Sequence, residues 1–451
     1  MLVDMSCQES ISTEQLEHFS SVFHESRANE LAAYAATKNG IMEASVSYEG
    51  VRKLSNAFSI QLEQGHITAQ KGSGRCWIFA ALNTFRYELM HKWNLKDFEL
   101  SQNYIFFYDK LEKSNYFLES VIKTLDEPVD GRLYSYLNSM PLGDGGQWAL
   151  FAALVKKYGV VPLDAYPESA NSQNSRGFVA YVTSKLREFA IELRRLSEGG
   201  ASPDELRARK AQQMEVIYRM LVISLGEPPK SFDFTVRTKD NEVIQEYGIT
   251  PQQFFDKYVG IELDDLIGLV NAPASNKPMN RTYTVKFLGN VVESEPVKYL
   301  NLPIEKVKAG AIAQLKDGHP VWFGSDCRPF SARKEGLFDR SSSRIEDLYD
   351  VRYNFTKGER LEYGDSAMNH AMVFQGVNLD PDGKPDRWRV ENSWGKDSGL
   401  EGYYIASDAW FDEFVYQVVL DRKYLDPEDV ALWDQEPIEL EPWDPLGSLA
   451  D

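Results

Sequence analysis

The string Gln70-Lys71-Gly72-Ser73-Gly74-Arg75-Cys76-Trp77 carries the strongest structural signal in this chain. After it, the residues up to Trp93 contain neither Gly nor Pro and place apolar side chains at helical spacing. Cys76 is therefore expected at a helix N-terminus, where the helix dipole favours thiolate and the glycines let backbone amides approach a reacting carbonyl oxygen. A lone cysteine is more often a small buried apolar residue, but this setting favours a nucleophile.

A nucleophilic thiol needs a base, and His370 is the candidate. It begins the apolar run from His370 to Val377, which predicts a strand that carries the imidazole at its end. Asn392 lies in Glu391-Asn392-Ser393-Trp394-Gly395, where its carbonyl oxygen can accept a hydrogen bond from the imidazole and fix its tautomer. The sequence thus predicts Cys76 as nucleophile, His370 as base and Asn392 as the residue that orients the base.

These strings, in the order Cys, His, Asn, resemble the papain-like cysteine peptidases. The resemblance implies that the Gln70 side chain and the backbone N–H of Cys76 form an oxyanion hole. It also implies that glycines in Gly143 to Trp148 hold an extended substrate backbone. The remaining residues that we assign are Trp77 and Trp394 as supporting side chains, and Gly145, Gly146 and Asn369 as substrate-binding residues.

The spacing of the candidate residues indicates a large insertion. His370 follows Cys76 at roughly twice the ~130–150 residues of simple papain-like enzymes. Together with Lys157-Tyr158-Gly159-Val160 and the string around Asn392, this resembles the bleomycin hydrolase and bacterial aminopeptidase C family. The implied fold is α+β and papain-like, with a helical lobe, a β-rich lobe, a helical insertion and a C-terminal arm. The expected segments are an N-terminal helical docking segment at 1–60, the helical lobe with the nucleophile at 61–170, the mainly helical insertion at 171–300, the β-rich lobe at 301–425 and the arm at 426–451.

The C-terminal arm of that family lies in its own active-site cleft and restricts cleavage to free N-termini. A terminal carboxylate can pair with the α-ammonium of a peptide while the arm blocks residues further upstream. This chain ends in Ala450-Asp451, one residue beyond the expected terminal alanine, and we assign both residues to substrate binding. From composition, the acidic, proline-containing tail after Asp426 is expected to run extended over the surface.

Hydrophobic periodicity and capping signals predict the other elements. Ser202, Pro203 and Glu205 form a capping-box pattern at the start of the second helix of a hairpin. The predicted helices are 12–38, 177–196, 203–225 and 304–315, with a strand pair over 232–247 and strands at 320–324, 370–377, 387–391 and 402–405.

Composition limits the partners and the compartment. The 451 residues include 49 Lys and Arg against 68 Asp and Glu, and the formal charge of −19 opposes binding to nucleic acid or anionic membranes. No segment approaches the ~18 apolar residues of a membrane span, so a cytoplasmic protein is expected. The three cysteines, Cys7, Cys76 and Cys327, predict neither a disulfide framework nor a metal site, and no cofactor is expected. Peptides are the expected partners, and the resemblance implies a homohexamer.

The residues thus predict a cysteine peptidase that works through a thioester acyl-enzyme, and the family resemblance implies that it is an aminopeptidase. Three alternatives remain open at this point. An endopeptidase would use the same chemistry, with Asp451 as the feature that separates the two readings. A non-catalytic peptide-binding protein would be expected to lack the nucleophile, the base or the orienting residue, and all three are present. An acyltransferase differs only in the nucleophile that reaches the acyl-enzyme.

Overall fold

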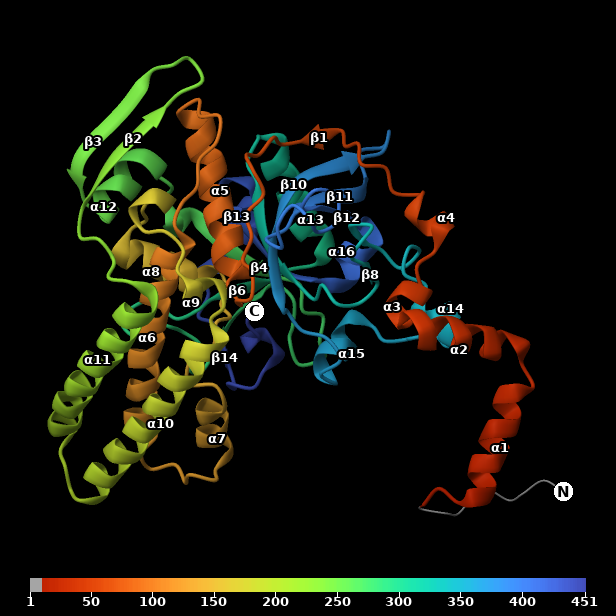
Figure 1. Ribbon diagram of the computed structural model, residues 1–451, viewed down its shortest axis with the longest axis horizontal. Coiled ribbons are helices and arrows are strands. Elements are labelled where there is room, and N and C mark those ends of the chain that lie inside the picture. The colour runs from red at the N-terminus through yellow and green to blue at the C-terminus, as the bar shows by residue number, and fades with distance from the viewer. Residues whose placement is uncertain (1–9) are drawn as a thin grey trace.

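The computed structural model describes residues 10–451, in which a helical lobe and a sheet lobe lie side by side (Figure 1). Cys7 lies outside the described residues. The helices of the helical lobe are α5 (Cys76–Lys92), α6 (Gln102–Lys123), α7 (Arg132–Ser139), α8 (Trp148–Tyr158), α9 (Ala170–Gln173), α10 (Arg176–Glu198), α11 (Pro203–Leu225) and α12 (Pro251–Phe254).

The sheet lobe is built on one sheet that has twelve strands within residues 10–451. In spatial order these are β14 (Ile438–Leu440), β5 (Arg281–Val285), β6 (Tyr299–Asn301), β4 (Leu266–Val270), β13 (Val415–Asp421), β7 (Val321–Ser325), β10 (His370–Leu379), β11 (Pro385–Glu391), β12 (Tyr403–Ser407), β9 (Leu337–Phe338) and β8 (Ser331–Ala332), with β1 (Ile60–Gln61) beside β10. The helices of this lobe are α13 (Ile304–Lys316), α14 (Ile345–Tyr349), α15 (Lys357–Glu362), α16 (Asp408–Phe414) and α17 (Pro427–Trp433). The four strands expected in the second half of the chain are present, with ends shifted by a few residues.

The long hairpin of α10 and α11 confirms the helices expected on either side of Gly199-Gly200. The Ser202 hydroxyl accepts from the Glu205 N–H, and the Glu205 carboxylate accepts from the Ser202 N–H, which is the predicted capping box. Gly200 has φ +88°, a conformation that costs a residue with a side chain. The predicted strand pair is also present, as β2 (Phe232–Arg237) and β3 (Val243–Ile249).

The N-terminal segment contains two main helices where the sequence predicted one. The helices are α1 (Thr13–His24) and α2 (Arg27–Asn39), followed by the short α3 (Ile41–Ala44) and α4 (Tyr48–Val51). The chain breaks at Ser26, whose φ of −108° and ψ of 112° are extended and place it as the N-cap of α2. α2 lies beside α3 and α14 at the edge of the molecule, and α1 projects away from the body (Figure 1).

The range 171–300, expected to be mainly helical, also supplies three strands to the central sheet. β4 pairs with β13, and β6 lies between β4 and β5. These strands are short, and their partners lie far away in the sequence, so their apolar runs carry no local signal that separates them from the helices before them.

The expectation that the tail runs extended over the surface is wrong. Pro427 occupies the first turn of α17, and β14 adds a parallel strand to β5 at the edge of the sheet. Further along, Ala450 is fully buried, and the C-terminus lies between the two lobes (Figure 1). The prolines and acidic residues explain why the first part of the tail is exposed to solvent. The path of the tail is set by its contacts with other segments of the chain.

Candidate active site

Cys76 is the first residue of α5, as the sequence predicted. The helix packs against β10, and the Cys76 Sγ accepts a hydrogen bond at 3.5 Å from the backbone N–H of Ala371, the residue after His370. The backbone N–H of a first helical residue has no acceptor inside its own helix. The thiol is completely buried, and burial raises the pKa of Cys76 well above its ordinary value.

His370 begins β10, and its Nε2 lies 2.9 Å from the Asn392 Oδ1. The orientation of the Asn392 amide follows from a second contact, because its Oδ1 also accepts from the Ser393 N–H at 2.8 Å. His370 Nε2 must therefore carry the ring proton, which leaves Nδ1 as the unprotonated, basic nitrogen. Burial lowers the pKa of His370 to about 4, although the Asn392 hydrogen bond acts in the opposite direction.

Trp394, which the sequence analysis assigned to a supporting role, covers the imidazole. Its ring stacks on His370 with centroids 4.7 Å apart, and the Arg333 guanidinium lies 4.8 Å from the Trp394 ring centroid. The second supporting residue, Trp77, donates its indole N–H to the Asp144 carbonyl at 2.9 Å. Each tryptophan therefore joins one side of the site to a neighbouring loop.

Gln70 lies on a loop that pairs with the segment after Asn392. Its backbone N–H donates to the Ser393 carbonyl at 2.8 Å, and the Ser393 hydroxyl donates to the Gln70 Oε1 at 2.6 Å. One proton of Nε2 goes to the Ser73 carbonyl at 2.7 Å. The second proton of that amide is the one available to a bound carbonyl oxygen.

The glycine wall faces the C-terminal arm. Gly146 donates to the Ala450 carbonyl at 2.9 Å and accepts from the Ala450 N–H at 3.0 Å, which is an antiparallel pairing. A Cβ on Gly145 would lie 2.9 Å from the Ala450 carbonyl oxygen, and a Cβ on Gly146 would collide with the Trp77 ring. The bare backbone of both glycines is therefore required by what lies on each side of it.

The chain continues past Ala450 to Asp451, which the arm holds between the two lobes. The Asp451 N–H donates to the Asn369 carbonyl at 3.0 Å, so Asn369 contacts the arm through its backbone. The Asn369 side chain points elsewhere, because it donates to Asp326 and accepts from the Cys327 N–H. Asp451 also borders a cavity of about 210 Å³, lined by Gly72, Ser73, Gly74, Asp144, Ser175, Arg176 and Val179.

The family described as "Peptidase C1-like family" matches residues 10–447. This chain belongs to that family. Aminopeptidase C of Lactobacillus delbrueckii subsp. lactis is 46% identical over 444 residues, covering 98% of this chain and 98% of that protein. Aminopeptidase C of Listeria monocytogenes serovar 1/2a is 44% identical over 443 residues, covering 98% of this chain and 100% of that protein.

The peptidase C1-like fold also matches a solved structure closely. The crystal structure of PepW from Lactobacillus rhamnosis HN001 matches with a TM-score of 0.95 and 45% identity, covering 98% of this chain and 100% of that chain. The expected α+β, papain-like fold is thereby confirmed, and so is the resemblance to the aminopeptidase C relatives.

The peptidase C1-like site contains buried charges that sequence reasoning missed. Lys110 lies 2.9 Å from the Asp144 carboxylate, and Lys113 donates to the Gly145 carbonyl at 2.6 Å. Burial by itself would raise the pKa of Asp144, but Lys110, Ser175 and the Gly74 N–H outweigh it and hold that pKa below its usual range. Charged residues on the buried face of α6 were the available signal, because such residues are seldom buried without a partner.

The electrostatics are different at the chain terminus. Burial, and then the nearby Asp144 carboxylate, raise the pKa of Asp451, while Lys110 and Lys113 oppose the change. The extra acidic residue is thus held beside another carboxylate rather than in a matched ion pair. Within residues 10–451, no group of three His, Cys, Asp or Glu side chains could hold a metal ion, and every helix is too short or too polar to cross a lipid bilayer.

Proposed function

We propose that this chain is a cysteine aminopeptidase whose C-terminal arm limits access to the cleft. The observation that carries the proposal is the antiparallel pairing of Ala450 with Gly146, beside Cys76 and one residue from the chain terminus. An arm seated in this way blocks the upstream side of the cleft, and displacement of Asp451 alone would make room there for a single substrate residue. The curated relatives named aminopeptidase C support the same reading.

In the proposed acylation step, His370 Nδ1 takes the proton of the Cys76 thiol, and the Cys76 sulfur attacks the carbonyl carbon of the first peptide bond. The Asn392 Oδ1 holds the Nε2 proton and stabilises the imidazolium that forms. His370 then gives its proton to the leaving amine, the C–N bond breaks, and a thioester joins the first residue to Cys76. Trp394 keeps water away from the hydrogen bond between His370 and Asn392.

The negative charge on the tetrahedral oxygen needs donors in fixed positions. The free Nε2 proton of Gln70 and the N–H of Cys76 are the proposed donors, and Trp77 holds the neighbouring glycine wall through the Asp144 carbonyl. In deacylation, water gives a proton to His370 and attacks the thioester carbon. The first residue leaves with a carboxylate, and the thiol of Cys76 recovers its proton.

The arm is the proposed determinant of exopeptidase specificity. Gly145 and Gly146 bind the arm in place of residues upstream of a substrate's first residue, and a terminal carboxylate can pair with the substrate's α-ammonium. Asp451 bonds to the Asn369 carbonyl, one residue before His370, and therefore lies where the first residue of a substrate would bind. Substrate must displace Asp451 from this position before it can react.

A comparison of two fluorogenic peptides tests this proposal. The two share one sequence and differ only in whether the α-amine is free or acetylated. An aminopeptidase has a kcat/KM on the free peptide at least about a hundredfold above that on the acetylated one, because the blocked amine loses its ion pair and collides with the arm. Equal values on both peptides would contradict the exopeptidase reading and favour the endopeptidase alternative. No cleavage of either, with the arm present or removed, would favour a non-catalytic peptide-binding protein.

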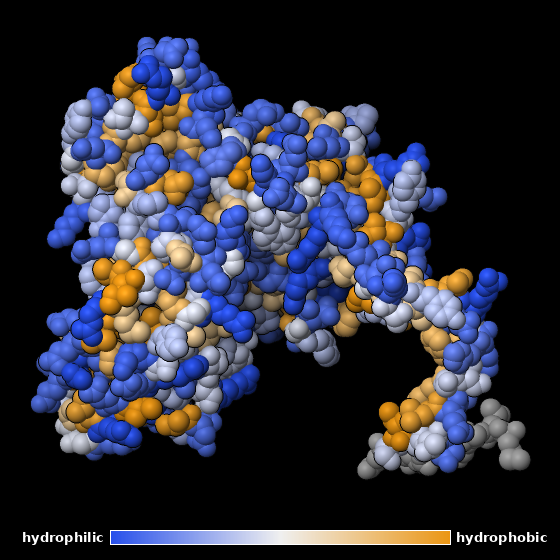
Figure 2. All heavy atoms as spheres, in the orientation of Figure 1, coloured by the Kyte–Doolittle hydropathy of each residue, from blue (hydrophilic) through white to orange (hydrophobic). Residues whose placement is uncertain are grey.

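The N-terminal helices support the proposal that the protein forms a homo-oligomer. The family resemblance implies that this oligomer is a hexamer. Neither α1 nor α2 has a buried residue, and both expose large apolar side chains. The exposed residues include Leu16, Phe19, Phe23, Leu31 and Tyr34. Orange apolar patches lie along these N-terminal helices in Figure 2. The proposed occupant of these patches is a second copy of this chain, because neither helix buries a residue fully within the monomer and their large apolar side chains stay exposed.

Peptides are the proposed partners rather than nucleic acid, because the formal charge of −19 repels a phosphate backbone. A cytoplasmic location stays a prediction from the sequence.

A further inference from the structure

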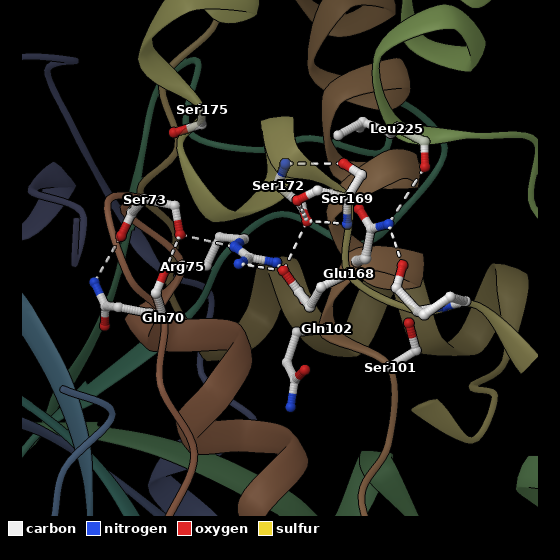
Figure 3. Close-up of polar contacts among 12 residues, drawn as sticks. Gln70, Ser73, Arg75, Ser101, Gln102, Glu168, Ser169, Ser172, Ser175 and Leu225 are labelled. Carbon is white, nitrogen blue, oxygen red and sulfur yellow. Dashed lines mark hydrogen bonds and ion pairs between the residues drawn. The ribbon is translucent and has the colours of Figure 1, made fainter. Parts of the chain in front are cut away.

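Arg75, the residue before Cys76, has a completely buried guanidinium group. Its two terminal nitrogens donate to the two carboxylate oxygens of Glu168, each at 2.8 Å (Figure 3). The guanidinium carbon also lies 5.1 Å from the ring centroid of Phe79 and 5.2 Å from that of Phe106. A two-pronged ion pair between aromatic rings has a single geometry, so Arg75 is a rigid anchor.

The third donor of Arg75 reaches the loop that carries Gln70. Arg75 Nε donates to the Ser73 hydroxyl at 2.8 Å, and that hydroxyl donates to the Gln70 carbonyl at 2.7 Å. Since the Ser73 oxygen accepts from Arg75, its only proton is directed at Gln70. Figure 3 shows this chain of contacts from Glu168 through Arg75 and Ser73 to Gln70.

Ser73 contacts Gln70 a second time through its backbone. The Ser73 carbonyl accepts one Nε2 proton of Gln70 at 2.7 Å, while the Ser393 hydroxyl holds the Gln70 Oε1 at 2.6 Å. Gln70 thus makes four hydrogen bonds with these residues, two with Ser73 and two with Ser393, and its placement depends on where the two serines lie. Ser393 belongs to the sheet lobe, whereas Arg75 and Glu168 hold Ser73 on the helical lobe.

The far side of the anchor is also fixed. The Ser172 hydroxyl donates to the Glu168 carboxylate at 2.7 Å, and Ser172 belongs to the capping box of α9. Glu168 keeps both of its hydrogen bonds to Arg75 without this contact, so Ser172 lies outside the chain of contacts that reaches Gln70.

We propose that Arg75 and Ser73 are positioning residues that set the direction of the Gln70 side-chain amide. The inference rests on the proposed role of Gln70 as an oxyanion donor. An oxyanion donor is effective only within about 2.7–3.1 Å of the developing charge, so a loop that drifts by a few tenths of an ångström loses transition-state stabilisation. The Ser73 hydroxyl links Arg75 to the Gln70 carbonyl. Without it the Gln70 carbonyl loses a hydrogen bond, and the Ser73 carbonyl, which accepts from the Gln70 amide, is held less firmly in place.

The test begins with Ser73→Ala, which removes the hydroxyl and leaves the pair of Arg75 and Glu168 intact. The expected result is a kcat about tenfold lower with KM changed by less than about twofold, because the contact is used in the transition state. The alkylation rate of Cys76 by iodoacetamide should stay unchanged, since that reaction develops no oxyanion. Ser172→Ala is the matched control, because it removes a hydroxyl from the other side of Glu168, and its kcat should stay within about twofold of wild type.

A double-mutant cycle separates positioning from a general structural effect. With Gln70→Ala already present, adding Ser73→Ala should lower kcat by less than about twofold, because the amide that Ser73 positions is gone. Arg75→Lys keeps the charge but loses the fork and the Nε donor, and it should reproduce the loss of Ser73→Ala, with circular dichroism to verify folding.

The outcomes distinguish this inference from the proposed function. If Gln70→Ala keeps the kcat of wild type, the oxyanion role of Gln70 is wrong and the inference falls with it. If Gln70→Ala is slow but Ser73→Ala is not, only the positioning role is wrong. If Ser73→Ala multiplies the loss of Gln70→Ala in full, the hydroxyl acts through another group, and this also overturns the inference.

Discussion

The backbone N–H of Asp451, the last residue of the chain, donates to the carbonyl of Asn369, the residue before His370, at 3.0 Å. The preceding residue, Ala450, exchanges two hydrogen bonds with Gly146 on the opposite wall. The terminus is therefore bound on both sides, as an extended peptide product would be bound. Under the proposed function, Asp451 competes with the first residue of every substrate.

Deleting Asp451 should increase activity on peptides with a free α-amine. The deletion removes the competing residue and places the terminal carboxylate on Ala450, whose backbone is already fixed by Gly146. The expected change is about a tenfold rise in kcat/KM, the gain for a competent state that was about one-tenth populated. Steady-state kinetics on the free-amine peptide measure it.

The control for that deletion is Asp451→Asn, which keeps the backbone in place and removes only the side-chain charge. Its kcat/KM should stay within about twofold of wild type, because the Asn369 carbonyl still holds the residue. If the deletion and Asp451→Asn give the same rate, competition by the backbone of Asp451 is not what limits the enzyme.

Removing residues 449–451 should open the cleft. Cys76 is completely buried with the arm in place, so its alkylation by iodoacetamide should become faster after truncation. N-acetylated peptides should begin to be cleaved, because the arm supplies no catalytic group and only blocks the upstream side. An unchanged ratio of rates on free and acetylated peptides would mean that the arm does not determine specificity.

Asn392→Ala should lower kcat less than Gln70→Ala does. Stacking on Trp394 keeps the His370 ring in place without the amide, whereas Gln70→Ala removes one of the two proposed oxyanion donors outright. Loss of one oxyanion donor costs about 10²–10³ in kcat. Parallel kcat measurements rank the two variants, and Asn392→Ala as the slower one would show that packing does not orient the imidazole.

Local signals explain which features could be predicted from sequence. The capping box of Ser202 and Glu205, the Cys76 helix start and the order of Cys76, His370 and Asn392 depend on neighbouring residues or on a recognisable string. The structure contains the predicted capping box and the predicted helix start at Cys76, and His370 begins the predicted strand. The two N-terminal helices were predicted as one because Ser26 interrupts a continuous apolar pattern through its backbone alone.

The features that could not be predicted depend on partners far away in the chain. Arg75 forms an ion pair with Glu168, Lys110 forms one with Asp144, and β14 pairs with β5. None of these pairs produces a periodic pattern in the sequence. The glycine string drew attention to Gly145 and Gly146 but not to the buried lysines that hold its carbonyls. Asn369 was assigned to substrate binding, yet its side chain is used by Asp326 and Cys327, and its carbonyl makes the contact with the arm.

Leu16→Glu combined with Phe19→Glu should weaken self-association. Leu16 is 56% exposed and Phe19 47% exposed on α1, and charge on an apolar contact face opposes docking of a second copy. Light scattering after gel filtration should give a smaller mass than that of wild type at equal concentration. Ser20→Glu is the control, because it adds charge next to this face without removing an apolar side chain, and a wild-type mass for the double variant would contradict the assigned interface.

The stability of the protein in mild acid should depend on His370. Its pKa is lowered to about 4 by burial, whereas in the unfolded chain it lies near 6.5. Between these two values the unfolded state binds the extra proton, so the free energy of unfolding rises with pH and is lost as the pH falls from about 6.5 towards 4. The expected loss from this one residue is about 2 kcal/mol between pH 7 and pH 5.

Urea unfolding of wild type and His370→Gln at the two pH values measures this loss, because glutamine does not titrate and the other acid-sensitive groups are shared. The variant should lose about 2 kcal/mol less than wild type over this interval. If both lose the same amount, His370 is not held neutral by burial, and an imidazolium paired with the Cys76 thiolate would account for the site better.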